Sequence, residues 1–386
     1  MITTGSSSLE LKFDVHIGGC FIDYTSIQRV NIELQENMHN LAILDVAGIS
    51  PQELTNYVDA PIQISIAVGS LRKYEFVGYI SHLEPESVNN HGLVNNSPFQ
   101  TTKMYCFGAS YVMKSRRTTV WNNKTLPQIA KEMASKYSLN ISVPNDPYIF
   151  PRLTQSGKSD WALLTEAAQY LGYSVLIRGV TIDIWDPFMA LSNHQFTPLY
   201  AMSENNSNSL NAKPGQVLKF KGTIGAVTPI SARTTDTIYA LVDNQIASVT
   251  KTDSTGYGSA VESIFSDEVS KNADSVDMAN AILKGRSKKK LPYTAEVTVV
   301  GDPTIQPGMV VNLEKYNSGL DGLWIVQAVR HEVFRGSALT YLTMAKDSNK
   351  SDTLTASTTV RTFPEFPAPL LRNSRWTTIR ELSYVY

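Results

Sequence analysis

The sequence predicts a β-rich α+β protein, in which two antiparallel β regions of barrel or sandwich type flank a small α/β module. Hydrophobic and polar residues alternate toward both ends of the chain, as they do in half-buried strands. Between these regions the hydrophobic spacing changes to the three-to-four-residue period of helices. At 386 residues, 42% of them hydrophobic, the chain can form two or three domains and is not disordered.

Residues 1–115 form the first predicted β region. Five or six short hydrophobic runs follow one another without a long helix, which is typical of antiparallel sandwiches and barrels. Asn89–Ser97 is polar and predicts an exposed loop. The predicted strands are Leu9–Ile17, Val30–Leu34, Leu41–Val46, Ile62–Val68, Phe76–Leu83 and Met104–Val112.

Residues 116–192 form the predicted α/β module. Its first helix follows Thr125, and Gln128 three residues later predicts a capping box. Its second helix opens at Ser159 and ends at Gly172, which can adopt the left-handed conformation. A hairpin is predicted from Tyr173–Ile177, Arg178-Gly179 and Val180–Trp185.

The rest of the chain divides into a connector, a second β region and an arm. Residues 193–215 are rich in Ser and Asn, and residues 348–386 predict an extended, partly Pro-rich arm. Residues 216–347 return to strands, with a helical insertion near 272–290. The expected strands and helix are Val217–Gly222, Ile238–Val249, Thr294–Val300, Met309–Leu313, Leu323–His331, Leu339–Met344 and the helix Ser275–Arg286.

Composition narrows the classes of partner. The net charge is −1, which gives no electrostatic reason to expect nucleic acid or an anionic membrane. Charged residues make up only 18% of the chain, and its 18 Tyr residues outnumber its 13 Phe. Such a surface is typical of buried interfaces and indicates assembly. No stretch approaches the roughly 20 apolar residues of a membrane span, and Met1–Leu9 lacks the features of a signal peptide.

The cysteines and tryptophans predict structural roles. Cys20 and Cys106 lie far apart in strand-like sequence, so buried free thiols in a reducing compartment are expected, with a single bridge as the alternative. Three tryptophans fall in regular hydrophobic patterns and are assigned to the core, whereas two are assigned to contact surfaces. They are Trp161, Trp185 and Trp324 for the core, and Trp121 and Trp376 for contacts.

The usual catalytic signatures are missing. The chain has no phosphate-binding or dinucleotide-binding glycine motif, no nucleophile elbow and no zinc-protease motif. Its six histidines are scattered, which argues against a metal site. We therefore expect no catalytic residue, cofactor or metal. The enzymatic alternative is a glycosidase-like carboxylate pair, such as Glu84 with Glu86.

Two charged groups are interpreted as solvated surface. The acidic residues Glu262, Asp267 and Glu268 lie in Ser-rich sequence. The basic run at 286–290 is assigned to a helix end, where cations complement the helix dipole.

A weak internal repeat connects the two β regions. In each, a strand is followed by a loop, a glycine and a second strand, first from Pro61 through Gly78 to Leu83 and later from Pro307 through Gly322 to His331.

One segment carries a family resemblance. Gln155, Ser159, Asp160, Trp161, Leu164, Gly172 and Tyr173 resemble the Q-x(n)-S-D-W-x-x-L-x-x-A-x-x-x-G-Y segment of phage tail hub proteins. That family includes late-control D proteins and the amino-terminal part of VgrG-type spikes. The run from Val297 through Gln306-Pro307-Gly308 to His331 is similar to the family's second β-domain.

The resemblance implies a fold and a function. The two β regions are expected to be tail-tube-like domains of a homotrimeric hub whose six domains form a pseudo-sixfold ring. This ring would adapt the hexameric tail tube to a trimeric central spike. The chain ends at Tyr386 without a spike sequence, so the spike is expected to be a separate polypeptide. The alternatives are a tail-associated peptidoglycan hydrolase and a carbohydrate- or receptor-binding tail component.

The resemblance also implies partners and a location. Expected partners are further copies of the chain, the spike, the tail tube or a distal tail protein, other baseplate proteins and the tape measure protein. No membrane or specific nucleic-acid binding is expected. The location is the virion tail tip, assembled in the host cytoplasm.

The arm is a candidate partner contact. It carries apolar side chains on a proline-stiffened segment, which lowers the entropy cost of binding in an extended form. The alternative is that the arm folds back on its own β-domain. Its candidate contact residues are Phe363, Phe366, Leu370, Leu371, Trp376, Tyr384 and Tyr386.

Overall fold

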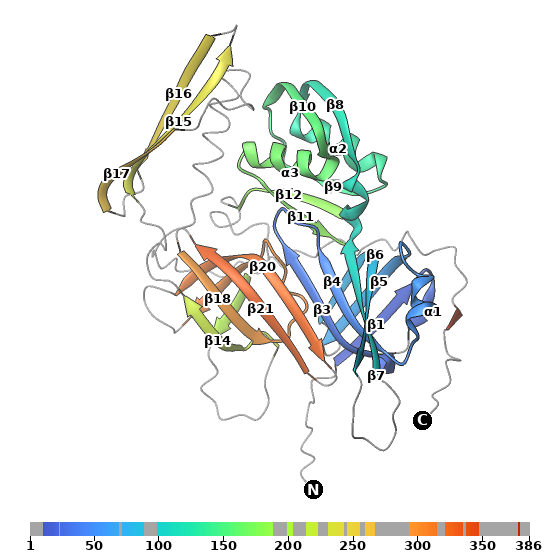
Figure 1. The fold of residues 1–386 in the computed structure, drawn as a ribbon. Coiled ribbons are helices and arrows are strands. Elements are labelled where there is room, and N and C mark those ends of the chain that lie inside the picture. The colour runs from blue at the N-terminus through green and yellow to red at the C-terminus, as the bar shows by residue number, and fades with distance from the viewer. Residues whose placement is uncertain are drawn as a thin grey trace.

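One large sheet dominates the fold (Figure 1). The computed structural model describes residues 11–22, 24–68, 72–88, 99–187, 199–203, 214–222, 231–242, 245–254, 259–266, 293–314, 321–334, 337–346 and 377–378. The sheet has 14 strands in the order β14-β18-β21-β20-β3-β4-β7-β6-β5-β1-β2-β22, where β22 is Thr377–Thr378, and β19 and β13 branch from β20. The predicted β-rich α+β class is confirmed. Over these residues the sheet keeps two ends and does not close into a barrel.

Six strands form what we call the first strand unit. They are β1 (Leu11–Ile17), β3 (Ile27–Gln35), β4 (Leu41–Ala47), β5 (Pro61–Val68), β6 (Arg72–Val88) and β7 (Phe99–Gly108). Buried and half-buried residues alternate strictly along β4 and β5, which explains their strand conformation. Short elements join them: β2 (Cys20–Ile22), the 3-10 helix η1 (Tyr24–Ser26) and α1 (Pro51–Thr55). A second 3-10 helix, η2 (Ala109–Lys114), follows β7 and leads into the α/β module.

A second strand unit repeats this arrangement. It consists of β13 (Leu199–Ser203), β14 (Val217–Gly222), β18 (Tyr293–Val300), β19 (Val310–Glu314), β20 (Gly322–Phe334) and β21 (Ser337–Lys346). When the six strands of each unit are numbered along the chain, both units have the sheet order 2-3-6-5-4-1. The orientations differ only in the last pair, because β1 and β5 are antiparallel whereas β13 and β19 are parallel.

The irregularities of the two units also correspond. The pairing of β6 with β7 shifts register between Ile80 and His82, and that of β20 with β21 shifts between Val326 and Ala328. The bulges of β3 and β14 also match, lying at Ile27/Arg29 and Val217/Lys219. β-Bulges bend and twist a strand at defined positions and are kept within related folds. Matching bulges therefore align the two units residue by residue.

A backbone turn before the fourth strand is shared as well. Asp59 has φ 66° and its N–H donates to the Ile80 carbonyl over 2.8 Å. Gly308 has φ 84° and its N–H donates to the Val326 carbonyl over 2.7 Å. Asp59 and Gly308 therefore hold the same place in the two units.

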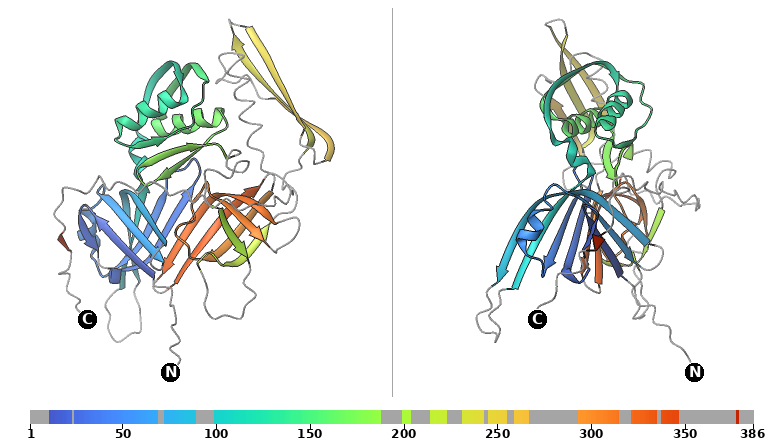
Figure 2. Two further views of the ribbon diagram at one scale, coloured as in Figure 1. Left: turned by 180° about the vertical axis from the view of Figure 1, so that it is seen from behind. Right: turned by 90° about the vertical axis from the view of Figure 1, so that its right-hand side faces the viewer.

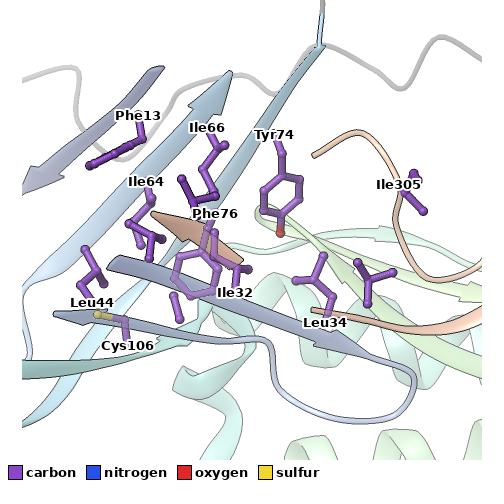
Figure 3. Close-up of a cluster of buried hydrophobic side chains, with 14 of the residues drawn as sticks. Phe13, Ile32, Leu34, Leu44, Ile64, Ile66, Tyr74, Phe76, Cys106 and Ile305 are labelled. Atoms are coloured by element: carbon purple, nitrogen blue, oxygen red, sulfur yellow. The ribbon is translucent and has the colours of Figure 1, made fainter. Parts of the chain in front are cut away.

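The units share one hydrophobic core. They join where residues 328–334 of β20 pair antiparallel with residues 29–35 of β3. In Figure 3, Tyr74 and Leu34 lie between the first-unit residues Ile66 and Phe76 and the second-unit residue Ile305. The Tyr74 and His331 rings are 5.8 Å apart.

The α/β module has its own core and sits at one end of the strands (Figure 2). Its elements are β8 (Arg116–Thr125), α2 (Leu126–Lys136), β9 (Asn140–Ser142), β10 (Ile149–Ser159), α3 (Asp160–Tyr170), β11 (Ser174–Arg178) and β12 (Thr181–Trp185). A further sheet of β15 (Ser231–Val242), β16 (Gln245–Ser254) and β17 (Ser259–Ser266) is inserted between β14 and β18.

Several local expectations need correction. The strand expected over Met104–Val112 ends at Gly108 and continues as η2. The single strand expected over Ile238–Val249 is the hairpin β15-β16. The expected connector contains β13, whose pairing with β19 is long-range and leaves no local sequence signal.

The module also departs in detail from the expectation. β8 and β10 were not anticipated, because strand conformation here depends on their mutual pairing. In the hairpin, Arg178 pairs with Thr181, so the turn is Gly179-Val180.

The side-chain expectations hold in part. Cys20 and Cys106 are free thiols, half-buried and buried respectively. Trp161 and Trp324 are buried, and Trp185 is half-buried. Trp121 is half-buried and packs on the module core, and its assignment to a contact surface stays a prediction.

The loop Asn89–Ser97, the helical insertion near 272–290, the basic run at 286–290 and residues 348–376 lie outside the described residues. The domain boundaries inferred from the sequence stay a prediction.

Candidate functional site

α3 begins and ends with the capping contacts that the sequence motif predicts. Ser159 Oγ accepts a hydrogen bond from the Ala162 N–H over 3.1 Å, as an N-cap does. At the other end Gly172 has φ 83°, and the Tyr173 N–H donates to the Ala168 carbonyl over 2.9 Å. These contacts match the expected helix start and stop.

Asp160 lies at the positive end of the α3 dipole and also accepts hydrogen bonds from three side chains. It is only 2% exposed. Its carboxylate accepts hydrogen bonds from Lys136 Nζ at 2.6 Å, Tyr137 Oη at 2.7 Å and Gln155 Nε2 at 2.7 Å. Gln155 is fully buried and its Nε2 also donates to the Lys158 carbonyl. Asp160 therefore ties together α2, β10 and α3.

The electrostatics of Asp160 follow from these contacts. Burial alone raises the pKa of the Asp160 carboxyl, but the hydrogen bonds from Gln155, Lys136 and Tyr137 outweigh it and hold this pKa below the usual value. The sequence motif could not reveal these partners, because Lys136 and Tyr137 lie more than 20 positions away.

The remaining motif residues are buried in or against the module core, and Tyr173 also forms a hydrogen bond. Trp161 is 5% exposed, and its ring lies 4.9 Å from that of His39. Leu164 is fully buried in the module core. The Tyr173 hydroxyl donates to the Asp146 carboxylate over 2.7 Å.

The β3–β4 turn is the first anchor of the module. The Asn37 N–H donates to the Val175 carbonyl over 2.8 Å, and the Val175 N–H donates to Asn37 Oδ1 over 3.0 Å. Asn40 Nδ2 donates to the Ile177 carbonyl over 2.9 Å. A turn of the first strand unit thus continues the edge of the module sheet.

Arg178 is the second anchor, and sequence reasoning missed it. Its guanidinium forms a buried ion pair with Asp183 at 3.1 Å. The same guanidinium donates to Gln306 Oε1 over 2.9 Å and to the Pro307 carbonyl over 3.0 Å. Arg178 therefore fixes the module to the second strand unit. The Gln306-Pro307-Gly308 sequence was its only signal, as part of the family resemblance.

The positions of Glu84 and Glu86 do not support the alternative of a glycosidase-like carboxylate pair. Glu84 and Glu86 are exposed on β6, where Glu84 accepts a hydrogen bond from the Tyr105 hydroxyl and Glu86 lies 3.5 Å from Lys103. A glycosidase acid needs an environment that raises its pKa. Glu262 lies in β17, and Asp267 and Glu268 lie outside the described residues.

A groove of about 440 Å³ lies on the sheet face over β3, β14, β18, β20 and β21. Its walls carry both charge signs, including Glu33, Lys219, Lys221 and Arg330. In the part of the chain that is described, no cluster of His, Cys, Asp or Glu is suited to hold a metal ion. No described helix is long and apolar enough to cross a membrane.

Comparison with solved structures identifies the fold. The 43 kDa tail protein of prophage MuSo2 from Shewanella oneidensis is 14% identical, with a TM-score of 0.63 over 88% of this chain and 99% of that one. The tail protein from Neisseria meningitidis MC58 is 14% identical, with a TM-score of 0.65 over 87% and 97%. The chain has the fold of these phage tail proteins.

The same fold occurs in a component of a secretion system. The E. coli c3393 protein, described as a type VI secretion component similar to the T4 tail proteins gp27 and gp5, is 9% identical. Its TM-score is 0.54 over 87% of this chain and 76% of that one. No protein-family model and no curated protein matches the sequence. The expected resemblance is confirmed at the level of the fold.

Proposed function

We propose that this chain is the structural hub of a bacteriophage tail tip or baseplate. Three copies form a pseudo-sixfold ring that adapts the hexameric tail tube to a trimeric central spike. The observation that carries the proposal is the repeated strand unit, with its common strand order and matching bulges. Two similar units in each of three chains give six similar surfaces, which match the hexameric tail tube. The three chains themselves have threefold symmetry, which matches a trimeric spike.

The proposal includes partners and a location. The ring binds the spike on one side and the tail tube or a distal tail protein on the other, with other baseplate proteins and the tape measure protein nearby. Its place is the virion tail tip, after assembly in the host cytoplasm. The likeness to phage tail proteins and to a secretion-system component supports this placement.

Assembly is tested by light scattering of the purified chain, alone and with its spike. The expected mass is three copies of 42.7 kDa, or three copies plus the spike. A stable monomer under all conditions, spike included, overturns the ring.

The proposed role is not enzymatic. The exposed positions of Glu84 and Glu86 on β6 support this, because the carboxylate pair of a glycosidase lies in a cleft around the substrate. A peptidoglycan zymogram is expected to show no clearing. Clearing that disappears in Glu84→Gln or Glu86→Gln would instead establish the hydrolase, and binding of the isolated chain to host cells would establish a receptor-binding component.

A further inference from the structure

The large sheet has several unpaired edges over the described residues, and two of them have paired counterparts in the other strand unit. One belongs to β14, which pairs only with β18. The other belongs to the second half of β6, residues 82–88, which pairs only with β7 because β5 reaches no further than Tyr79. Figure 1 shows β14 at one side of the sheet and β6 and β7 at the other. Such edges are templates for another strand.

The internal repeat gives each unpaired edge a counterpart that is paired. β14 holds the place of β3, and the second half of β6 holds the place of the second half of β20. Within the chain these counterparts pair antiparallel, with Glu332 opposite Asn31. Arg29 of β3 also forms an ion pair with Glu332.

The bulges set the correspondence residue by residue. Glu86 lies as many residues after the β6 bulge as Glu332 lies after the β20 bulge, so the two correspond. Counting from the bulges of β14 and β3 in the same way, Lys219 corresponds to Arg29 and Lys221 corresponds to Asn31. Lys219 and Glu86 are thus the equivalents of Arg29 and Glu332, and within one chain Glu86 lies 3.5 Å from Lys103. Glu86, Lys219 and Lys221 are exposed. The β14 edge therefore carries two lysines, of which Lys221 also lies 3.5 Å from Glu296 of β18, and the β6 edge carries Glu84 and Glu86.

We infer that β14 of one chain pairs antiparallel with the second half of β6 of a second copy, with Lys221 opposite Glu86. Every junction between strand units then has the same register, whether it lies within a chain or between chains. The interface is head-to-tail, because two different surfaces meet in it. Such an interface forms a closed ring when the rotation from one chain to the next is a whole fraction of a full turn. This inference rests on the proposed ring and names the contact that closes it.

Disulfide trapping tests the register. Facing residues in antiparallel strands have Cα atoms roughly 4.5–5.5 Å apart, which suits a disulfide. In a Cys20→Ser background, Glu86→Cys with Lys221→Cys is expected to give covalently linked dimers and trimers on mild oxidation. The matched control, Lys73→Cys with Lys221→Cys, uses the half of β6 already covered by β5 and is expected to stay unlinked.

Charge reversal tests the ion pair. Glu86→Lys or Lys219→Glu alone is expected to raise the concentration needed for assembly by at least about tenfold, because like charges then meet. The double reversal is expected to restore assembly only in part, because the lysine introduced at position 86 still faces Lys221. Lys131→Glu at an exposed position of α2 is expected to leave assembly unchanged.

The outcomes separate the two proposals. A chain that stays monomeric with its spike overturns the ring itself. A trimer in which the 86/221 pair does not cross-link, or in which charge reversal has no effect, leaves the hub intact and overturns this contact. In that case the lysines of β14 serve only to protect an edge strand.

Discussion

At the residue scale, Asp160 organises the start of α3 through contacts from α2 and its C-cap and from β10. The helix dipole alone accounts for less than about 1 kcal/mol. Removing the charge of a buried carboxylate with cationic partners costs more, because its donors lose their acceptor. The polar partners of Asp160 therefore matter more to stability than its position in the first helical turn.

Asp160→Asn is expected to lower the free energy of unfolding by about 2–4 kcal/mol, and Ser159→Ala by about 1 kcal/mol. Chemical denaturation at neutral pH measures both. Because the pKa of Asp160 is held low in the fold, its contribution is present above its unfolded pKa of about 3.9 and is lost as pH falls further. Equal costs for the two variants would contradict the network.

His331 predicts a second pH dependence. Burial lowers the pKa of His331 to about 4, and its Nδ1 lies 3.1 Å from Thr340 Oγ1. The unfolded chain then binds the proton more readily, so stability is full above pH 6.5 and decreases as pH falls toward 4. The maximum loss is on the order of 3 kcal/mol.

We expect His331→Gln to reduce this loss, as measured by urea denaturation between pH 7 and 4.5. The pKa of His39 is also lowered to about 4 by burial, so part of the pH dependence should remain in the variant. A pH profile unchanged by the substitution would count against the buried neutral imidazole.

At the element scale, Arg178 determines how the module meets the second strand unit. Arg178→Met leaves the Asp183 carboxylate buried without its cation and should cost about 3–5 kcal/mol. The double variant Arg178→Met/Asp183→Leu should recover part of this loss, since no unpaired charge remains. Unfolding free energies of the two single variants and the double variant measure the coupling. Additive costs would refute it.

The corresponding turns before β5 and β19 give an element-scale test of the repeat. Asp59 and Gly308 both have positive φ. Asp59→Gly should be tolerated, while Asp59→Ala should be less stable than Asp59→Gly by about 1 kcal/mol. Gly308→Ala should cost more, because its Cβ would lie 2.9 Å from Leu176 Cδ1 and 3.0 Å from Arg178 Nη2. Melting temperatures rank these variants, and a stabilising Gly308→Ala would break the correspondence.

At the scale of the whole molecule, the carboxy-terminal arm remains a predicted partner contact. Its candidate residues lie outside the described part of the chain. Thr377 and Thr378 form β22, which pairs with β2 of the same chain. That short pairing favours the alternative in which the arm is a strap on its own β-domain.

Deletion of residues 360–386 distinguishes the two. The docking arm, which is the prediction from the sequence, would leave the melting temperature of the isolated chain nearly unchanged and weaken trimer or spike association. A loss of several degrees with normal assembly identifies the strap. Scanning calorimetry and light scattering of the same preparation measure both quantities.

The sequence by itself determined the features that depend on near neighbours. Alternation predicts strands such as β4 and β5, and Ser159 and Gly172 mark the ends of α3, because capping and half-burial are decided within a few residues. The Asp160 network, the Arg178 anchor and the strand β13 were decided by tertiary structure, since their partners are distant in sequence. The residue-level repeat also belongs to tertiary structure: its bulges and turns are equivalent in backbone geometry, while the side chains at the same places, such as Asp59 and Gly308, differ.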